Sequence, residues 1–224
     1  MEILKDFNIS IDKKSIIRTV STYYTLHNNA EIDDIYDSLE KLAFKIIRPL
    51  GIFKLDNMPS IKPTSILDSC EYIVYCVFTI GDEITDVINR LFTDDQFDRA
   101  LILDAISTFM LFEISKQLCN KVFEYTSKKN LGLTCRIAPG DGEIDIAFQK
   151  NIIMNFNNHE ELGIKIVHDY LIKPYKSLSY VFGADKNIEI NRHDHKCVDC
   201  YNTKCFMRNS NDKIRGPFNN ILEG

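Results

Sequence analysis

The chain has 224 residues, of which 45% are hydrophobic and 26% are charged, with a formal net charge of −5. This is the composition of an ordinary globular protein, and the length suits one large domain better than two. A negative chain with no concentration of Lys and Arg lacks the field that neutralises phosphates, which argues against a nucleic-acid partner.

No stretch reaches the roughly 20 apolar residues of a membrane helix, and residues 1–12 lack the apolar core of a signal peptide. We therefore expect a cytoplasmic protein with no membrane partner. The seven cysteines are an odd number in such a chain, which predicts reduced thiols rather than a disulfide framework.

The first clear elements are a helix and a strand. Apolar residues recur at three- and four-residue steps over residues 31–47, which predicts a helix that ends at Pro49 and Gly51. Residues 71–80 form a continuous apolar run, typical of a strand covered on both faces, and Gly81 ends it.

Two helices follow, over residues 82–92 and 97–125, and the second is the expected central helix. A helical segment lies near residues 146–155, and three segments have the length and composition of strands: residues 131–137, 164–170 and 177–182. Because strands and helices do not alternate one for one, we predict an α+β fold with an antiparallel or mixed sheet and packed helices.

We divide the chain into three parts. Residues 1–69 are expected to be a helical and strand extension packed on the main domain, residues 70–190 its core, and residues 191–224 a Cys-rich segment and polar tail.

The segment Arg-Ile-Ala-Pro-Gly-Asp-Gly, residues 136–142, stands between a strand-like and a helical segment. Arg136 supplies a planar fork of donors that matches a carboxylate, and Gly140 and Gly142 lack the Cβ that would keep a ligand from the backbone. The segment is therefore a candidate site for an amino-acid carboxylate. The alternative is an ordinary surface turn, because Pro-Gly-Asp-Gly is a common turn sequence.

This turn is one of four motifs that follow one another over roughly residues 70–185. They are Thr79-Ile80-Gly81; Leu103-Asp104-Ala105-Ile106-Ser107; Arg136-x-x-Pro139-Gly140 with Gly142, Glu143 and Gln149; and Lys173-Pro174-Tyr175-Lys176-Ser177-Leu178-Ser179. Together they resemble the activation domain of cobalamin-dependent methionine synthase. The family turn reads Arg-x-x-Pro-Gly-Tyr.

The resemblance implies an α+β domain on a twisted, mainly antiparallel sheet that binds S-adenosylmethionine. It implies an accessory, partner-dependent methyltransferase component that supports reductive methylation of cob(II)alamin on a separate corrinoid-binding methyltransferase such as methionine synthase. An electron-donor protein is a further expected partner. The implied ligand-binding residues are Arg136 as the carboxylate partner, Ala138 and Gly140 through their backbone, and the neighbouring turn residues Pro139, Asp141 and Gly142.

The chain departs from the family pattern at two places. Asp141 replaces the family's Tyr, which removes an aromatic contact and adds a negative charge near a ligand that carries a sulfonium. The family's acid on the long helix falls at Gln117, with Glu113 one turn earlier, and we take both as candidate ligand contacts.

Three cysteines near the C-terminus, Cys197, Cys200 and Cys205, are preceded by His193 and His195. Thiolates at this spacing can converge on zinc, with His195 or His193 as a fourth ligand, or on an iron-sulfur cluster. The spacing resembles a C-terminal element of standalone relatives of the same family. The alternative is a set of reduced thiols on a surface loop.

Two other functions compete with the accessory role. One is a noncatalytic module that docks on a corrinoid protein. The other is a small metal or iron-sulfur redox protein that no longer binds S-adenosylmethionine, which the charge of Asp141 would suit.

Overall fold

The computed structural model describes residues 1–23, 32–140 and 144–190. Its centre is a five-stranded sheet in which every neighbouring pair is antiparallel, so the predicted α+β class with a mainly antiparallel sheet is confirmed. In the order of the sheet, its strands are β1 (Glu2–Leu4), β2 (Leu50–Asn57), β3 (Tyr72–Thr79), β7 (Ser177–Asp185) and β4 (Gly132–Leu133).

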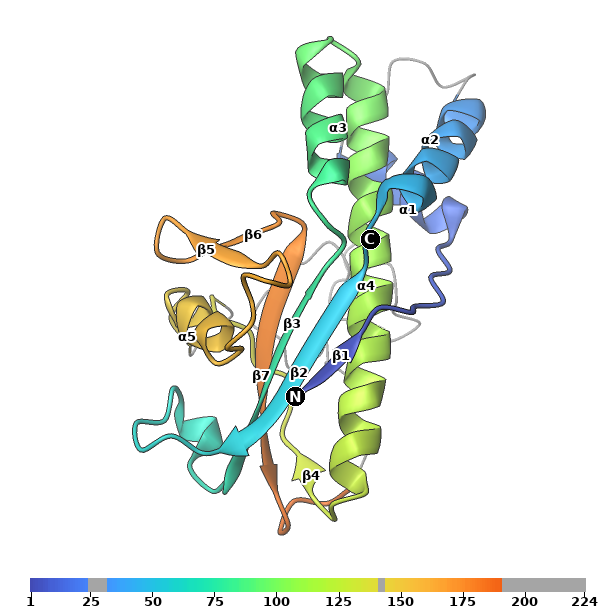
Figure 1. Ribbon diagram of the computed structural model, residues 1–224. Helices are drawn as coiled ribbons and strands as arrows, with labels where there is room; N and C mark the ends of the chain where they lie inside the picture. The colour runs from blue at the N-terminus through green and yellow to red at the C-terminus, as the bar shows by residue number, and fades with distance from the viewer. Residues whose placement is uncertain (24–31, 141–143, 191–224) are drawn as a thin grey trace, which may run out of the picture.

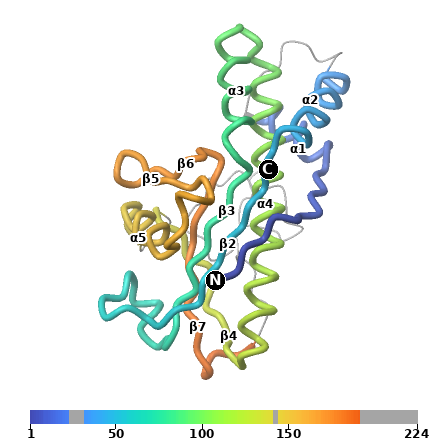
Figure 2. Tube along the Cα trace, viewed as in Figure 1, coloured from blue at the N-terminus to red at the C-terminus, as the bar shows by residue number. Residues whose placement is uncertain are grey.

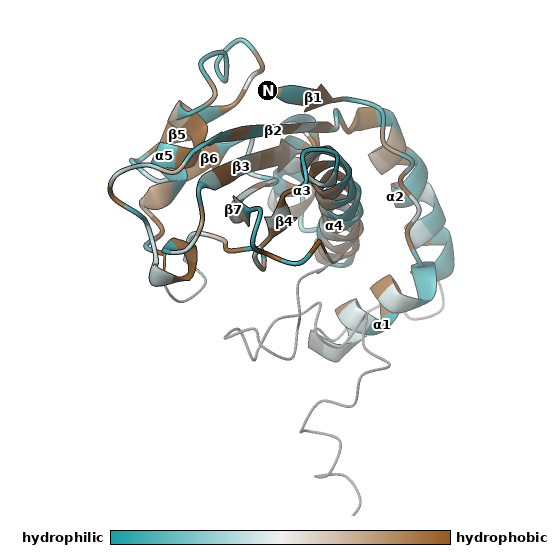
Figure 3. Cartoon of the chain, turned by 90° about the horizontal axis from the view of Figure 1, so that it is seen from below, coloured by the Kyte–Doolittle hydropathy of each residue, from teal (hydrophilic) through white to brown (hydrophobic). Residues whose placement is uncertain are grey.

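Helices and a small hairpin cover the two faces of this sheet (Figure 1). One face holds α1 (Lys13–Tyr23), α2 (Ile32–Ile46), α3 (Glu83–Thr93) and α4 (Phe97–Ser127), and the other holds α5 (Phe148–Met154) with the hairpin of β5 (Lys165–Val167) and β6 (Leu171–Lys173). Seen from below, the sheet curls around α4 (Figure 3). Each face therefore has its own apolar core.

Strand β3 lies between the two cores, which explains why its sequence is apolar throughout. Alternate side chains of a strand point to opposite faces, so Val74, Cys76 and Phe78 enter the core on the α4 side. Ile73, Tyr75 and Val77 enter the core on the α5 side. The predicted strand at residues 71–80, covered on both faces, is confirmed.

Helix α4 is the axis of the molecule. It is 31 residues long and contacts α1, α2 and α3 as well as strands β2, β3 and β4. A helix with neighbours on most sides needs apolar residues on most sides, and its buried residues, which run from Ala100 to Thr126, are distributed in this way. The predicted long central helix is confirmed.

The structure corrects the predicted strand at residues 164–170. Only Lys165–Val167 is a strand, and His168 and Asp169 lie in the turn of the β5–β6 hairpin with φ of 49° and 67°. Asp and His are among the residues that tolerate this left-handed region, which a period-two pattern does not reveal.

Two further elements differ from the predictions. Strand β2, which pairs with β3 over eight residues, lies in the predicted helical and strand extension, for which no strand bounds were predicted. It also places residues 50–57, from the predicted extension, in the same sheet as the predicted core. The predicted strand at residues 131–137 is regular only at Gly132–Leu133, with an isolated bridge at Ile137.

None of the helices in the described ranges combines the length and the apolar character needed to span a membrane.

Candidate functional site

Arg136 follows β4, where the chain runs along the edge of β7. Its neighbour Ile137 exchanges two backbone hydrogen bonds with Val181, at 3.0 and 2.9 Å, and buries its side chain in the core on the α5 side. Because successive side chains of an extended segment point to opposite faces, Arg136 projects toward α4. The bridge to β7 therefore sets the direction of the guanidinium.

Two uncharged side chains hold this guanidinium. Nη1 of Arg136 donates a hydrogen bond to Oγ of Ser115 on α4 at 3.1 Å, and its Cζ lies 5.2 Å from the ring centroid of Tyr180 on β7. No Asp or Glu in the described part of the chain forms a salt bridge with Arg136. A guanidinium has five N–H donors, so most of the fork remains for a ligand.

Tyr180 supports Arg136 from the sheet. It lies opposite Cys76 of β3, is buried, and has its hydroxyl 3.2 Å from Sγ of Cys119 on α4. Burial, and then the neighbouring thiols, raise the pKa of Tyr180 well above its ordinary value, and burial also raises the pKa of Cys76. Neither group therefore supplies a negative charge to Arg136 at neutral pH.

A half-buried cation between neutral groups favours an anionic ligand, because a charge removed from water gains most from an opposite charge with matched hydrogen bonds. The planar fork of Arg136 fits a carboxylate with two parallel hydrogen bonds. The geometry around Arg136 is compatible with the predicted carboxylate contact, which stays a prediction.

The turn after Arg136 is compact. Pro139 is buried, and Gly140 is exposed with φ of +87°, a conformation that favours glycine. The N–H of Gly140 donates to the carbonyl of Ile144 at 2.8 Å. The carbonyl of Gly140 is therefore available for the predicted backbone contact with a ligand, whereas its N–H is already bonded to Ile144.

The other predicted turn residues have different outcomes. Ala138 is partly buried and packs against the core on the α4 side. Asp141 and Gly142 lie outside the described residues, so their roles stay predictions.

Glu113 and Gln117 do not join this cluster. Gln117 accepts a hydrogen bond from the backbone N–H of Asn8 and donates one to the backbone carbonyl of Asn8. It also donates a hydrogen bond to Glu113. Gln117 therefore fixes the segment between β1 and α1, whose path is visible in Figure 2. Residues two positions apart point about 200° apart on a helix, so both side chains lie nearly opposite Ser115. The α4 side chain that the structure brings to Arg136 is Ser115.

A second cluster lies at the other end of β7. Nζ of Lys176 contacts Oδ1 of Asp104 at 2.8 Å and Oγ1 of Thr108 at 2.9 Å, both on α4. The backbone carbonyl of Lys176 accepts from the hydroxyl of Thr79 and the N–H of Ile80. Three motifs of the sequence comparison, at Thr79, Asp104 and Lys176, thus meet in one place.

The predicted metal ligands Cys197, Cys200, Cys205 and His195 lie outside the described residues, so this site stays a prediction. Of the other cysteines, Cys70 and Cys76 are buried, Cys119 is half-buried and Cys135 is exposed. No group of three or more possible metal ligands occurs within residues 1–23, 32–140 and 144–190.

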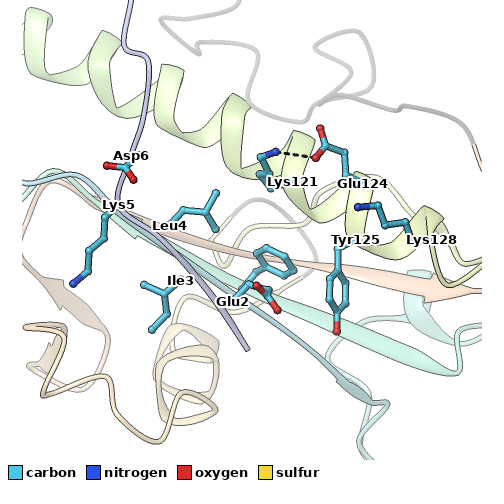
Figure 4. Close-up of a pocket in the computed structure, with 10 residues that line it drawn as sticks. Glu2, Ile3, Leu4, Lys5, Asp6, Lys121, Glu124, Tyr125 and Lys128 are labelled. Carbon is cyan, nitrogen blue, oxygen red and sulfur yellow. Dashed lines mark hydrogen bonds and ion pairs between the residues drawn. The ribbon is translucent and has the colours of Figure 1, made fainter.

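A surface hollow of about 460 Å³ lies away from Arg136, between β1 and the last turns of α4 (Figure 4). Its lining combines an apolar part, including Phe53 and Tyr125, with lysines and acids in equal number: Lys5, Lys121 and Lys128, and Glu2, Asp6 and Glu124. None of the predicted ligand-binding residues lines it, and its mixed charge selects no ligand class.

Sequence reasoning missed Ser115, Tyr180 and Lys176 as members of the site. Lys176 lies inside the motif at residues 173–179, so this motif could have been used to predict Lys176 as a site residue. Ser115 and Tyr180 gave none, because a Ser within a helix and an aromatic residue within a strand are ordinary core residues.

No protein-family model matches the chain, and no curated protein does. Among solved structures, the chain is similar to the crystal structure of the MetH reactivation domain bound to AdoHcy. The TM-score is 0.59 at 12% sequence identity, and the likeness covers 84% of this chain and 79% of that one. It extends over most of both chains and concerns the fold.

Proposed function

We propose that this chain binds S-adenosylmethionine through Arg136 and supports the reductive methylation of cob(II)alamin on a separate corrinoid methyltransferase such as methionine synthase. Two independent findings support the proposal. The ordered motifs at residues 79–81, 103–107, 136–149 and 173–179 resemble the methionine synthase activation family. The fold is like that of the MetH reactivation domain, a protein solved with AdoHcy.

One observation carries the proposal: Arg136 presents its guanidinium between a hydroxyl and an aromatic ring, with no salt bridge to a described residue. An amino-acid carboxylate is the ligand group that matches this fork. S-adenosylmethionine and its product AdoHcy both carry one.

The residues of this chain would bind and orient the methyl donor, while the corrinoid on the partner supplies the nucleophile for the sulfonium methyl group. The partner's corrinoid would supply the acceptor for the methyl group, a separate electron-donor protein would supply the electron, and this chain would hold S-adenosylmethionine and then its product AdoHcy. Orientation of two reactants is itself a large part of such catalysis. The protein's contribution is thus position and charge rather than a covalent step on its own side chains.

The test has two stages. Calorimetric titration should first show binding of AdoHcy to the chain. A cob(II)alamin-loaded methionine synthase that lacks its own activation domain is then incubated with reductant and S-adenosylmethionine, and methylcobalamin is followed by absorbance. Methylcobalamin that forms only when the chain is present supports the proposal, and formation at the same rate without the chain contradicts it.

We further propose a metal site at Cys197, Cys200 and Cys205, on the strength of the sequence spacing alone. An iron-sulfur cluster there would give the chain an electron carrier of its own, and zinc would give a structural site. Iron, sulfide and zinc are measured in protein purified without oxygen, and a Cys200→Ser variant should lose the bound metal. Wild-type protein that contains none of the three would exclude the site.

A further inference from the structure

One face of α4 carries a row of polar side chains that contact β7 and Arg136. Asp104, Thr108, Ser115 and Cys119 are separated by four, seven and four residues, so on a helix of 3.6 residues per turn they fall within about 60° of one another. Asp104 and Thr108 contact Lys176, Ser115 contacts Arg136, and Cys119 contacts Tyr180. The row therefore connects the two clusters of the site along one line.

At the end of this row formed by Asp104, Lys176 fixes the orientation of the Asp104 carboxylate, which still reaches solvent. The side chain of Lys176 is 18% exposed, and that of Asp104 is 50% exposed. The contact from Lys176 is to Oδ1 of Asp104, and Oδ2 is the second oxygen of the same carboxylate. An ionised carboxylate is an acceptor only, so Oδ2 is suited to a ligand that donates.

The distance between the two ends can be derived from helix geometry. Asp104 and Ser115 are 11 residues apart, which is roughly 16 Å along the axis of α4. In S-adenosylmethionine, seven bonds separate the carboxylate carbon from C3′ of the ribose. Three backbone bonds span 3.8 Å, so seven bonds span roughly 9 Å when extended. A hydrogen bond of about 3 Å at each end brings the reach to roughly 15 Å, so an extended ligand whose carboxylate is at Arg136 brings its ribose hydroxyls to Asp104.

The stretch of β7 between the two ends offers unpaired backbone groups. Val181 uses its N–H and C=O to bond Ile137, and β4 pairs with β7 only at Ala184 and Asp185. Because outward-facing residues alternate in an antiparallel ladder, Ser179 also directs its N–H and C=O to this edge. Neither group has a backbone partner among the described residues.

Leu178, beside these groups, is 38% exposed. Solvent therefore reaches the stretch that an extended ligand would cover.

We propose that Asp104 binds the ribose of the ligand, with its carboxylate accepting hydrogen bonds from the 2′- and 3′-hydroxyl groups. Lys176 and Thr108 are positioning residues, because Lys176 contacts Oδ1 of Asp104 and Thr108 accepts a hydrogen bond from Lys176. A carboxylate is a common partner of ribose hydroxyls in nucleotide sites. This assignment rests on the proposed function, since it takes S-adenosylmethionine as the ligand.

The experiment compares AdoHcy with its 2′,3′-dideoxy analogue by calorimetric titration. For the wild-type chain, loss of both hydroxyls should weaken binding by about 10- to 100-fold, the range for hydrogen bonds to a charged acceptor. Asp104→Ala should bind AdoHcy more weakly and should no longer distinguish the two ligands. Asp104→Asn keeps the size of the side chain, and it serves if the alanine variant fails to fold.

Glu124→Ala is the matched control. Glu124 lies on the same helix, contacts a lysine, Lys121, at 2.9 Å, and is 54% exposed against 50% for Asp104. This variant should distinguish the two ligands as well as the wild type does.

The outcomes separate this inference from the function on which it rests. If the wild-type chain does not bind AdoHcy, both the proposed function and the ribose site are wrong. If the wild type binds AdoHcy and the Asp104 variants still prefer it over the dideoxy analogue by the wild-type factor, only the ribose site is wrong.

Discussion

The two cations that face α4 are held in different ways. Lys176 has a carboxylate counter-ion, Asp104, at 2.8 Å, whereas Arg136 has a hydroxyl and an aromatic ring. A cation with its own counter-ion has most of its interaction energy inside the protein. A cation between neutral groups keeps that interaction for a ligand. We therefore propose that Lys176 orients the site and that Arg136 binds the ligand.

The largest expected effect belongs to Arg136→Ala. Removal of the guanidinium should weaken binding of AdoHcy by about 1.5 to 3 kcal/mol, the usual size for a hydrogen bond to a charged group. Calorimetric titration measures the change. Arg90→Ala, at an exposed arginine whose Nε donates to the carbonyl of Asp86, is the control and should bind as the wild type does. Unchanged affinity in Arg136→Ala would remove Arg136 from the site.

Ser115→Ala should have a smaller effect on the same binding. The hydroxyl of Ser115 is neutral and holds one N–H of Arg136, so its loss should cost about 0.5 to 1.5 kcal/mol of affinity. Titration of AdoHcy into this variant and into Ser107→Ala gives the comparison, because Ser107 bonds only a backbone carbonyl of its own helix among the described residues. Equal affinity in the two variants would show that Ser115 does not position the guanidinium.

Lys176→Met tests the second of the two cations, and its main effect should be on the stability of the folded state. A partly exposed ion pair contributes little, so the free energy of unfolding should fall by at most about 1 kcal/mol. Urea unfolding measures this change, with Arg136→Ala in parallel. A larger loss of stability in Arg136→Ala than in Lys176→Met would reverse the roles that we assign to the two cations.

The smallest effect at neutral pH is expected for Tyr180→Phe, which keeps the ring beneath Arg136 and removes the hydroxyl. Burial raises the pKa of Tyr180 in the folded state above its ordinary value of 10.0. Above pH 10 the unfolded state therefore loses this proton while the folded state retains it, so wild-type stability falls as pH rises. Thermal unfolding at increasing alkaline pH should show a weaker decline in Tyr180→Phe, and parallel curves would contradict the buried, protonated phenol.

The contrast between predicted and missed elements follows from their patterns. The helices at residues 32–46, 83–93 and 97–127 and strand β3 have long periodic or continuous apolar runs, which survive in any tertiary context. Strand β2 contains Gly51 and three polar residues near its end, so its pattern alone is weak. It is a strand because β3 pairs with it over eight residues.

The same contrast holds within the site. The sequence singled out Arg136 and the turn at Gly140 because a basic residue before a glycine-containing turn is a local signal. Gln117 and Glu113 were assigned from the family resemblance, and in the structure Gln117 bonds both the backbone of Asn8 and Glu113. A helix repeats every 3.6 residues, so an error of two positions moves a side chain to nearly the opposite face.

By itself, the sequence determined the α+β class, the long helix and the doubly covered strand, and it singled out Arg136 as a candidate carboxylate partner, because each depends on neighbouring residues. Only the tertiary structure decided which side chains surround that arginine. Ser115 and Tyr180 come from two elements that are far apart along the chain, and the curl of the sheet around α4 brings them together. Contacts between distant segments depend on packing, and local patterns carry no record of them.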